Sequence, residues 1–165
     1  TLPGAELFTA LQTGSIDATE WVGPYNDVAF GLHQAARYYY YPGWHEPGSV
    51  MECMVNLDAF NNLPPDLQGI VRVACQAANL DMLSEFNARN AAALEQIVAD
   101  ENVEIRAFPD DVLRSLKMLT VEVLNELADR DPLAAKVWDS YRSFQEHSRP
   151  WQKISEQAYL ATSEL

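Results

Sequence analysis

The spacing of apolar residues changes about a third of the way along the chain. Up to residue 62, stretches with helical spacing alternate with stretches in which apolar and polar residues take turns, as in strands. Beyond residue 62 the apolar positions recur at helical intervals almost throughout. The pattern predicts three segments: a mixed α/β segment over 1–62, a long helix within 63–101, and a short strand with helices over 102–165.

The first segment is expected to alternate helices and strands. A short helix near the start has apolar residues on one face, and Gly14 can end it in the left-handed conformation. Gly23-Pro24 interrupts the extended stretch that follows. The predicted elements are, in order, a helix over 3–13, a strand over 15–22, a helix over 25–36, a strand over 37–44 and a strand over 49–57.

One long helix is predicted in the middle of the chain. Pro64 and Pro65 suit a first helical turn, where a missing N–H group costs no intrahelical hydrogen bond. No Gly or Pro interrupts the apolar periodicity from Ile70 to Val98. An unbroken helix here has about 36 residues and a length of about 54 Å. Since this exceeds the diameter of so small a domain, the helix is either kinked or runs along a larger body or another subunit.

The last segment is predicted to contain one strand and three helices. Acidic residues and prolines mark the starts of the helices. The predicted order is a strand over 102–108, a helix capped by Asp110 or Asp111, a helix begun by Pro132, an interruption at Arg149-Pro150, and an amphipathic helix over 151–165.

Composition restricts the partners. The 165 residues are 48% hydrophobic, enough for the core of one domain or a large fragment of one. With 24 acidic and 11 basic residues the net charge is −13, which repels phosphate backbones and anionic lipid headgroups and so argues against nucleic-acid and membrane-surface partners. No run approaches the roughly 20 apolar residues of a membrane span. The start at Thr1 fits a mature secreted protein or a fragment equally well.

The two cysteines match no metal-binding motif. Cys53 and Cys75 lie 22 positions apart. We interpret them as small buried apolar residues, with a disulfide as the alternative.

Glu20 and Trp21 lie just before the break at Gly23-Pro24, with Val22 between. Backbone carbonyl groups at such a break lack regular partners and can turn towards a ligand. The Glu20 carboxylate and the Trp21 carbonyl would then offer adjacent hard oxygen donors, as Na⁺ and Ca²⁺ prefer. The alternative is a tryptophan in the core beside a glutamate on the surface.

A second loop, PGWHEPG over residues 42–48, is rich in Pro and Gly and carries Trp44, His45 and Glu46. Rigid loops often carry functional groups, although a turn with solvated polar side chains and no function would have the same sequence. His45-Glu46 is not the zinc-protease motif, because Pro47 stops a helix and no second His follows four residues later.

The tyrosines at 38–41 must send alternate rings to opposite faces of a strand, where they pack or line a cleft. No phosphate loop, nucleophile elbow or supported Cys-His pair is present in the sequence, so it shows no catalytic apparatus.

Four stretches together resemble one known family. The resemblance covers essentially the whole chain, and the order of the motifs is more specific than any one of them. It points to the C-terminal half of DctP-type substrate-binding proteins of tripartite ATP-independent periplasmic (TRAP) transporters, closest to the subgroup that binds 2-oxo and 2-hydroxy acids through a metal ion. The stretches are GAELFTALQTGSIDATEWVGPYND, YYYYPGWHEPG, VNLDAFNNLPPDLQ and VEIRAFPDDVL.

The resemblance implies a fold and a set of roles. The fold is α/β: the helix-rich C-terminal portion of a two-lobed type II periplasmic-binding-protein fold, with a long lobe-spanning helix and C-terminal helices that some members exchange across a dimer. Glu20 matches the metal-binding carboxylate of the family, and Trp21 the residue whose backbone oxygen joins it. Glu46 is a candidate further ligand or outer-sphere partner, and Trp44 and His45 candidates to line the pocket with Trp21.

The resemblance also implies a non-enzymatic periplasmic protein. It would bind Na⁺ or Ca²⁺ with a small carboxylate such as pyruvate or lactate, deliver the solute to TRAP membrane subunits, and form a homodimer. The family's substrate-clamping arginine and a metal-binding glutamine lie in its N-terminal half, before the first residue here. We therefore expect this chain to be a fragment that binds weakly or not at all by itself.

Two other functions compete with this one. The chain could form a helical dimer with no small-molecule ligand, through the long helix and residues 151–165. It could also be a metal-dependent enzyme with Glu20 and Glu46 as ligands and His45 as the titratable base.

Overall fold

The chain forms two compact units, Thr1–Phe108 and Pro109–Leu165. The computed structural model describes residues 2–46, 48 and 51–162. The division into 1–62, 63–101 and 102–165 stays a prediction.

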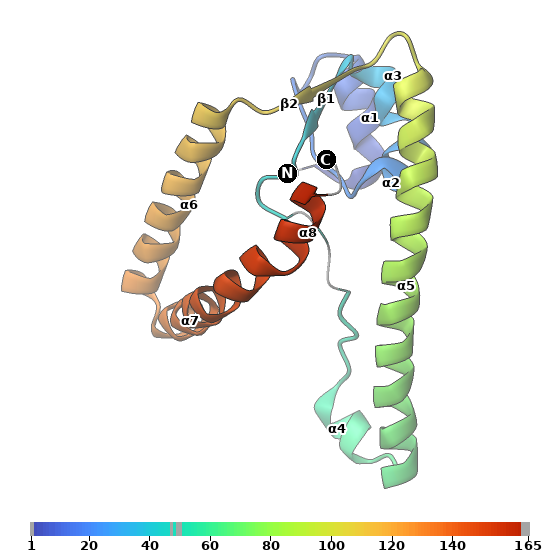
Figure 1. Ribbon diagram of the computed structural model, residues 1–165. Helices are drawn as coiled ribbons and strands as arrows, with labels where there is room; N and C mark the ends of the chain where they lie inside the picture. Colours follow the sequence, from blue (N-terminus) through green and yellow to red (C-terminus); the bar gives the residue numbers. More distant parts are fainter. Residues whose placement is uncertain (1, 47, 49–50, 163–165) are drawn as a thin grey trace. The chain divides into compact units, whose positions relative to one another are not determined.

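The first unit contains five helices and two strands among its described residues (Figure 1). Strands β1 and β2 pair in parallel, with Tyr38 opposite Glu104 and Tyr41 opposite Ala107. The elements are α1 (Gly4–Gln12), α2 (Pro24–Ala29), α3 (Leu32–Ala35), β1 (Tyr38–Tyr41), α4 (Leu57–Asn61), α5 (Pro65–Ala99) and β2 (Glu104–Ala107).

The core of this unit is small, with its buried residues on α1, α3 and the last turns of α5, and it includes the packing of α1 on α3 and of α2 on α5. Its buried apolar residues are Leu7, Ala10, Leu32, Ala93 and Ile97. The predicted long helix is confirmed, because α5 runs for 35 residues without a break and begins with a proline in its first turn. Most of its large apolar side chains are exposed, from Leu67 to Val98.

The predicted strand over 15–22 is wrong. Gly14 adopts the left-handed conformation at φ 70°, as expected, and the amides of Ser15 and Ile16 then both donate to the carbonyl of Ala10. The chain is thus folded back onto the end of α1, and within the described part of the chain residues 15–22 pair with neither β1 nor β2. The predicted helix over 25–36 is two helices, since Gly31 at φ 71° interrupts it between α2 and α3.

The predicted strand over 49–57 is also wrong where it can be judged. Residues 49 and 50 lie outside the described residues, and 51–56 are irregular and exposed. The Asn56 side chain accepts a hydrogen bond from the Ala59 amide at 2.9 Å and so starts α4 at the next residue. Alternation is thus not enough to make a strand without a partner. The expected burial of the cysteines is wrong too, because Cys53 is exposed and Cys75 only half-buried.

The second unit consists of helices α6 (Asp110–Arg130), α7 (Pro132–Ile154) and α8 (Glu156–Thr162). Helix α6 contacts α7, and α7 contacts α8, yet none of the described residues from 109 to 162 is buried. The unit therefore has helices without a closed core of its own.

Two predicted helix boundaries in this unit are wrong. The N-cap of α6 is Pro109, so Asp110 and Asp111 lie in the first turn, where they face the positive end of the helix dipole. Helix α7 continues through Pro150, because the loss of one N–H donor leaves the other bonds of the helix in place. The interruption comes instead at Ser155, with φ −105° and ψ −105°.

Among the described residues, no helix combines the length and the apolarity that crossing a bilayer requires.

Candidate metal and carboxylate site

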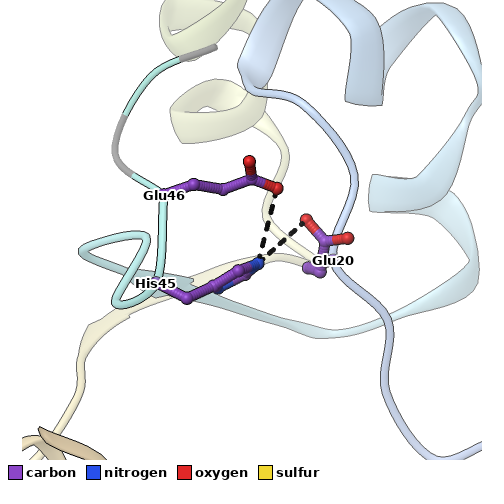
Figure 2. Close-up of side chains that lie close together, drawn as sticks. All are labelled: Glu20, His45 and Glu46. Carbon is purple, nitrogen blue, oxygen red and sulfur yellow. Dashed lines mark ion pairs between the residues drawn. The ribbon is translucent and has the colours of Figure 1, made fainter. Parts of the chain in front are cut away.

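Three candidate ligand side chains meet in the first unit. Glu20 comes from the segment between α1 and α2, and His45 and Glu46 come from the loop after β1 (Figure 2). His45 Nε2 lies 3.7 Å from Glu20 Oε2 and 3.5 Å from Glu46 Oε1. One potential ligand atom from each of the three lies within 4.8 Å of the others.

These separations suit one bound cation. Around an ion with ligand distances of about 2.3–2.6 Å, two ligands lie roughly 3.3–5.2 Å apart, depending on the angle between them. The side chains of Glu20, His45 and Glu46 are 64%, 36% and 56% exposed, so water screens the attraction between them. The cluster therefore adds little to stability and leaves its oxygen atoms accessible to a ligand.

Trp21 fixes the position of Glu20 from within the fold. Its indole ring lies 5.0 Å from the ring of Phe30 and presses on the start of α1, where a Cβ atom added to Gly4 would come within 2.7 Å of Trp21 Cη2. Only glycine allows this approach. Among the residues that the structure describes, no hydrogen bond ends on the Trp21 carbonyl oxygen, which leaves that oxygen available as a ligand.

Helix α5 holds the chain just after Trp21. The amide of Tyr25 donates to Oδ1 of Asn90 at 2.9 Å, and a Cβ atom on Gly23 would lie 3.3 Å from the same oxygen. The Tyr25 ring packs edge-on against Phe86 at 5.9 Å. The Gly-Pro break thus lets the chain turn onto α5, which anchors the segment that carries Glu20.

A partly buried hydrogen bond joins the two segments of the site. The hydroxyl group of Tyr39, on β1, donates to Oδ2 of Asp27, on α2, at 2.6 Å. Burial raises the pKa of Asp27, while the Tyr39 hydroxyl and the nearby amides of Val22 and Gly23 oppose the rise. Burial and the adjacent Asp27 carboxyl also raise the pKa of Tyr39. Because β1 leads directly into the loop with His45, this bond fixes that loop relative to the Glu20 segment.

The other two predicted site residues have different surroundings. Trp44 is 44% exposed, and its ring centre lies 4.8 Å from that of His45, so it flanks the cluster. The indole of Trp21 points to Gly4 and Phe30, and only its backbone oxygen is offered to a ligand. The structure therefore brings Glu20, His45 and Glu46 together, with Trp44 beside them.

The sequence analysis missed the residues that hold the site in place. Of the tyrosines at 38–41 only Tyr39 is half-buried, and the other three are exposed. Strand alternation sets Tyr39 apart from Tyr38 and Tyr40 but does not identify its partner. Nothing local marks Asp27 or Asn90, because each acts on a residue from another element.

The comparison with protein families gives a direct match. Residues 1–131 match the family described as bacterial extracellular solute-binding protein, family 7. The chain belongs to this family. The resemblance seen in the four sequence stretches is thereby confirmed, and so is the periplasmic location that it implies.

One relative and two solved structures of solute-binding proteins are especially similar. The chain is 37% identical over 158 residues to a monocarboxylate 2-oxoacid-binding periplasmic protein of Nostoc sp., covering 96% of this chain and 43% of the relative. A TRAP periplasmic solute-binding protein from Colwellia psychrerythraea, with bound calcium and pyruvate, is 41% identical with a TM-score of 0.92. One from Pseudoalteromonas atlantica, with bound sodium and pyruvate, is 42% identical with a TM-score of 0.90.

Each of the two alignments covers 98% of this chain but only 49% of the chain of the solved structure. The chain thus spans about half the length of the proteins it matches. The predicted fold class, the helix-rich C-terminal half of a TRAP solute-binding protein, is confirmed.

Proposed function

We propose that the protein containing this chain is the solute-binding component of a TRAP transporter. It captures a small 2-oxo or 2-hydroxy carboxylate such as pyruvate or lactate through a bound metal ion and delivers it to membrane subunits. The observation that carries the proposal is the convergence of Glu20 with His45 and Glu46, from loops 25 residues apart, within the reach of one cation.

Each candidate residue has a role in this proposal. The Glu20 carboxylate and the Trp21 carbonyl oxygen bind the cation, and Glu46 is a further ligand or orients the others. Carboxylate and carbonyl oxygens are the donors that Ca²⁺ takes in flexible geometry. Trp44 and His45 line the pocket for the solute. The two pyruvate-bound neighbours hold different ions, calcium in one and sodium in the other, so both are proposed here.

The carboxylate of the solute needs a cationic partner that this site does not offer. The two arginines beside the small sheet, Arg37 and Arg106, both pair with Glu104. We propose that an arginine and a glutamine from the other half of the protein complete the site. The chain alone should therefore bind weakly.

We propose that the protein binds its solute without catalysing a reaction. An enzyme using Glu20 and Glu46 as metal ligands and His45 as a base is the competing function, because His45 touches both carboxylates. Incubation of the full-length protein with calcium and pyruvate should leave the pyruvate unchanged, as followed by NMR. Turnover of pyruvate would favour the enzyme.

We also propose a homodimer, supported by apolar residues exposed on the helices of the second unit. Phe144 and Trp151 of α7 are 73% and 69% exposed, and Tyr159 of α8 is 73% exposed. A dimer that binds no solute is the second candidate function. A concentration-dependent size, together with no thermal shift on adding 2-oxo acids and cations, would favour that candidate.

Calorimetric titration of pyruvate and lactate, with calcium or sodium present, tests the proposal. Two proteins are compared: this chain, and a chain extended at its N-terminus by the half that the relatives have. Binding is expected only for the extended chain. Its Glu20→Gln variant should bind at least about 100-fold more weakly, because a direct ligand matters at least as much as the outer-sphere partners of metal sites.

Glu101→Gln is the matched control. It removes an exposed acid in the turn after α5 and changes the net charge equally, so it should bind like the unmodified protein. If the extended chain binds neither acid with any cation, or if Glu20→Gln binds normally, the metal-bridged site is wrong.

A further inference from the structure

Two other segments that are distant in sequence lie together at the first half of α5. A pocket of about 420 Å³ is lined on one side by the irregular stretch and α4, and on the other by one face of α5. Both cysteines of the chain lie in its wall. The lining residues are Cys53, Val55, Leu57, Phe60, Val71, Arg72, Cys75 and Gln76.

Contacts between α4 and α5 bring the two cysteines together. Nε2 of Gln68, on α5, donates to the carbonyl of Leu63 at 2.9 Å, which ties down the turn between the helices. The guanidinium of Arg72 lies 5.1 Å from the centre of the Phe60 ring on α4. The stretch before α4 therefore runs back along α5 (Figure 1), and Cys53 arrives beside Cys75.

The two thiols are neighbours in the wall of this pocket. The nearby Cys53 thiol, more than burial, raises the pKa of Cys75. Both are free thiols in the structure, and Cys53 is exposed to reagents from solvent. The protein belongs to a family of extracellular proteins, and the periplasm is oxidising.

We propose that Cys53 and Cys75 form a disulfide in the periplasm that joins the stretch before α4 to the long helix α5. The inference does not depend on the ligand proposed above, because the pocket and the Glu20 cluster share no residue.

The reaction is a thiol–disulfide exchange with a protein disulfide donor of the periplasm. The thiolate of Cys53, the more exposed of the two, attacks a sulfur atom of the donor's disulfide. A mixed disulfide forms, and one donor sulfur leaves and takes up a proton. Cys75 then loses its proton and attacks the Cys53 sulfur, which releases the second donor thiol. In total, two cysteine thiols lose two electrons and two protons, and the donor disulfide becomes a dithiol.

The bond would hold a segment that has little else to hold it. Residues 51–56 have no strand partner among the described residues, and their side chains are exposed. A disulfide would close a loop over 53–75 that contains α4, and such a link restricts mainly the unfolded chain. It would also tether the downstream end of the loop that carries His45 and Glu46.

Peptide mapping of the full-length protein tests the proposal. The protein is taken from the periplasm without reductant, and free thiols are blocked with iodoacetamide at lysis. Trypsin separates the cysteines cleanly, because cleavage after Arg37, Arg72 and Arg89 places Cys53 in peptide 38–72 and Cys75 in peptide 73–89. Mass spectrometry should find these two peptides linked before reduction and separate after it. Alkylation of both cysteines, or linkage of either to a different cysteine, would overturn the proposal.

Thermal unfolding provides a second readout. The melting temperature of the unmodified protein should fall by several degrees on adding reductant, to the value of the Cys53→Ser/Cys75→Ser double variant. The double variant is the matched control and should not respond to reductant. An equal response of the two proteins, or none in either, would show that no stabilising bond joins these residues.

Discussion

At the scale of single residues, the bond between Tyr39 and Asp27 connects the two segments of the candidate site. Asp27 is only 8% exposed, and its Oδ2 accepts from the Tyr39 hydroxyl group at 2.6 Å. Among the described residues its other oxygen, Oδ1, has no hydrogen-bond partner. Of the groups that favour the charged form of this carboxyl group, Tyr39 contributes most, ahead of the amides of Val22 and Gly23, so the buried group depends strongly on the Tyr39 bond.

Tyr39→Phe should therefore lower both stability and ligand affinity. Losing the partner of a buried acceptor costs about 1–3 kcal/mol in the free energy of unfolding. Denaturant unfolding of the full-length protein measures it, and calorimetry measures the expected weaker binding of pyruvate. Tyr38→Phe is the control, because Tyr38 is exposed on the same strand and should change the unfolding free energy by less than about 0.5 kcal/mol. Equal effects of the two variants would contradict this role of Tyr39.

The ion pairs of Glu104 predict a dependence on pH. The guanidinium groups of Arg106 and Arg37 hold the pKa of Glu104 below its usual value. A carboxyl group whose pKa is lowered by folding stabilises the protein above its unfolded pKa, and this contribution is lost as the pH falls through the folded pKa.

Glu104→Gln should therefore be less stable than the unmodified protein at about pH 7, and the difference should shrink on acidification to about pH 2. Because Glu104 is on the surface, the difference will also diminish in high salt. Chemical unfolding at each pH measures it. A difference that stays constant with pH would show that these arginines do not act on the carboxyl group.

Sequence and resemblance together identified the residues that offer ligand atoms, but not those that place them. Glu20 and Glu46 could be named because each lies in a recognisable motif, Glu20 three positions before Gly23 and Glu46 directly before Pro47. The hydrogen bonds of Asp27 and Asn90 span 12 and 65 positions, and a single sequence contains no local signal for such pairs.

At the scale of elements, long helices were predictable and short strands were not. Helix α5 supplies its own backbone hydrogen bonds, so apolar periodicity and a proline at its start were sufficient to place it. A strand takes its hydrogen bonds from a neighbour. Residues 15–22 and 51–56 have suitable compositions but no partner strand among the described residues, whereas β1 and β2 have each other.

Helix α7 allows a clean test of capping. The Asp131 side chain accepts from the amide of Leu133 at 2.8 Å and, more weakly, from that of Ala134 at 3.4 Å. Asp131→Ala should therefore lower the free energy of unfolding by about 1 kcal/mol.

Asp129→Ala is the matched control, because Asp129 is an exposed acid in the last turn of α6 with no capping role there. It should be neutral or slightly stabilising, since an acid is unfavourable at a helix C-terminus. Thermal unfolding followed by circular dichroism compares the two variants. Equal losses of stability would mean that capping does not explain the start of α7.

At the scale of the whole molecule, the large exposed apolar surface of α5 fits a chain that spans only about half the length of its relatives. Helix α5 exposes large apolar residues along its entire length, and a helix of that kind is normally covered by other parts of a protein. The similar solute-binding proteins are about twice as long as this chain. We infer that the other half of the protein covers part of this surface and completes the ligand site.

The most direct test of the metal-bridged site is a crystal structure of the full-length protein grown with calcium and pyruvate. The account predicts one calcium ion at about 2.3–2.6 Å from both a carboxylate oxygen of Glu20 and the carbonyl oxygen of Trp21, with pyruvate on the same ion. Pyruvate bound without a cation, or a cation that touches neither residue, would contradict it.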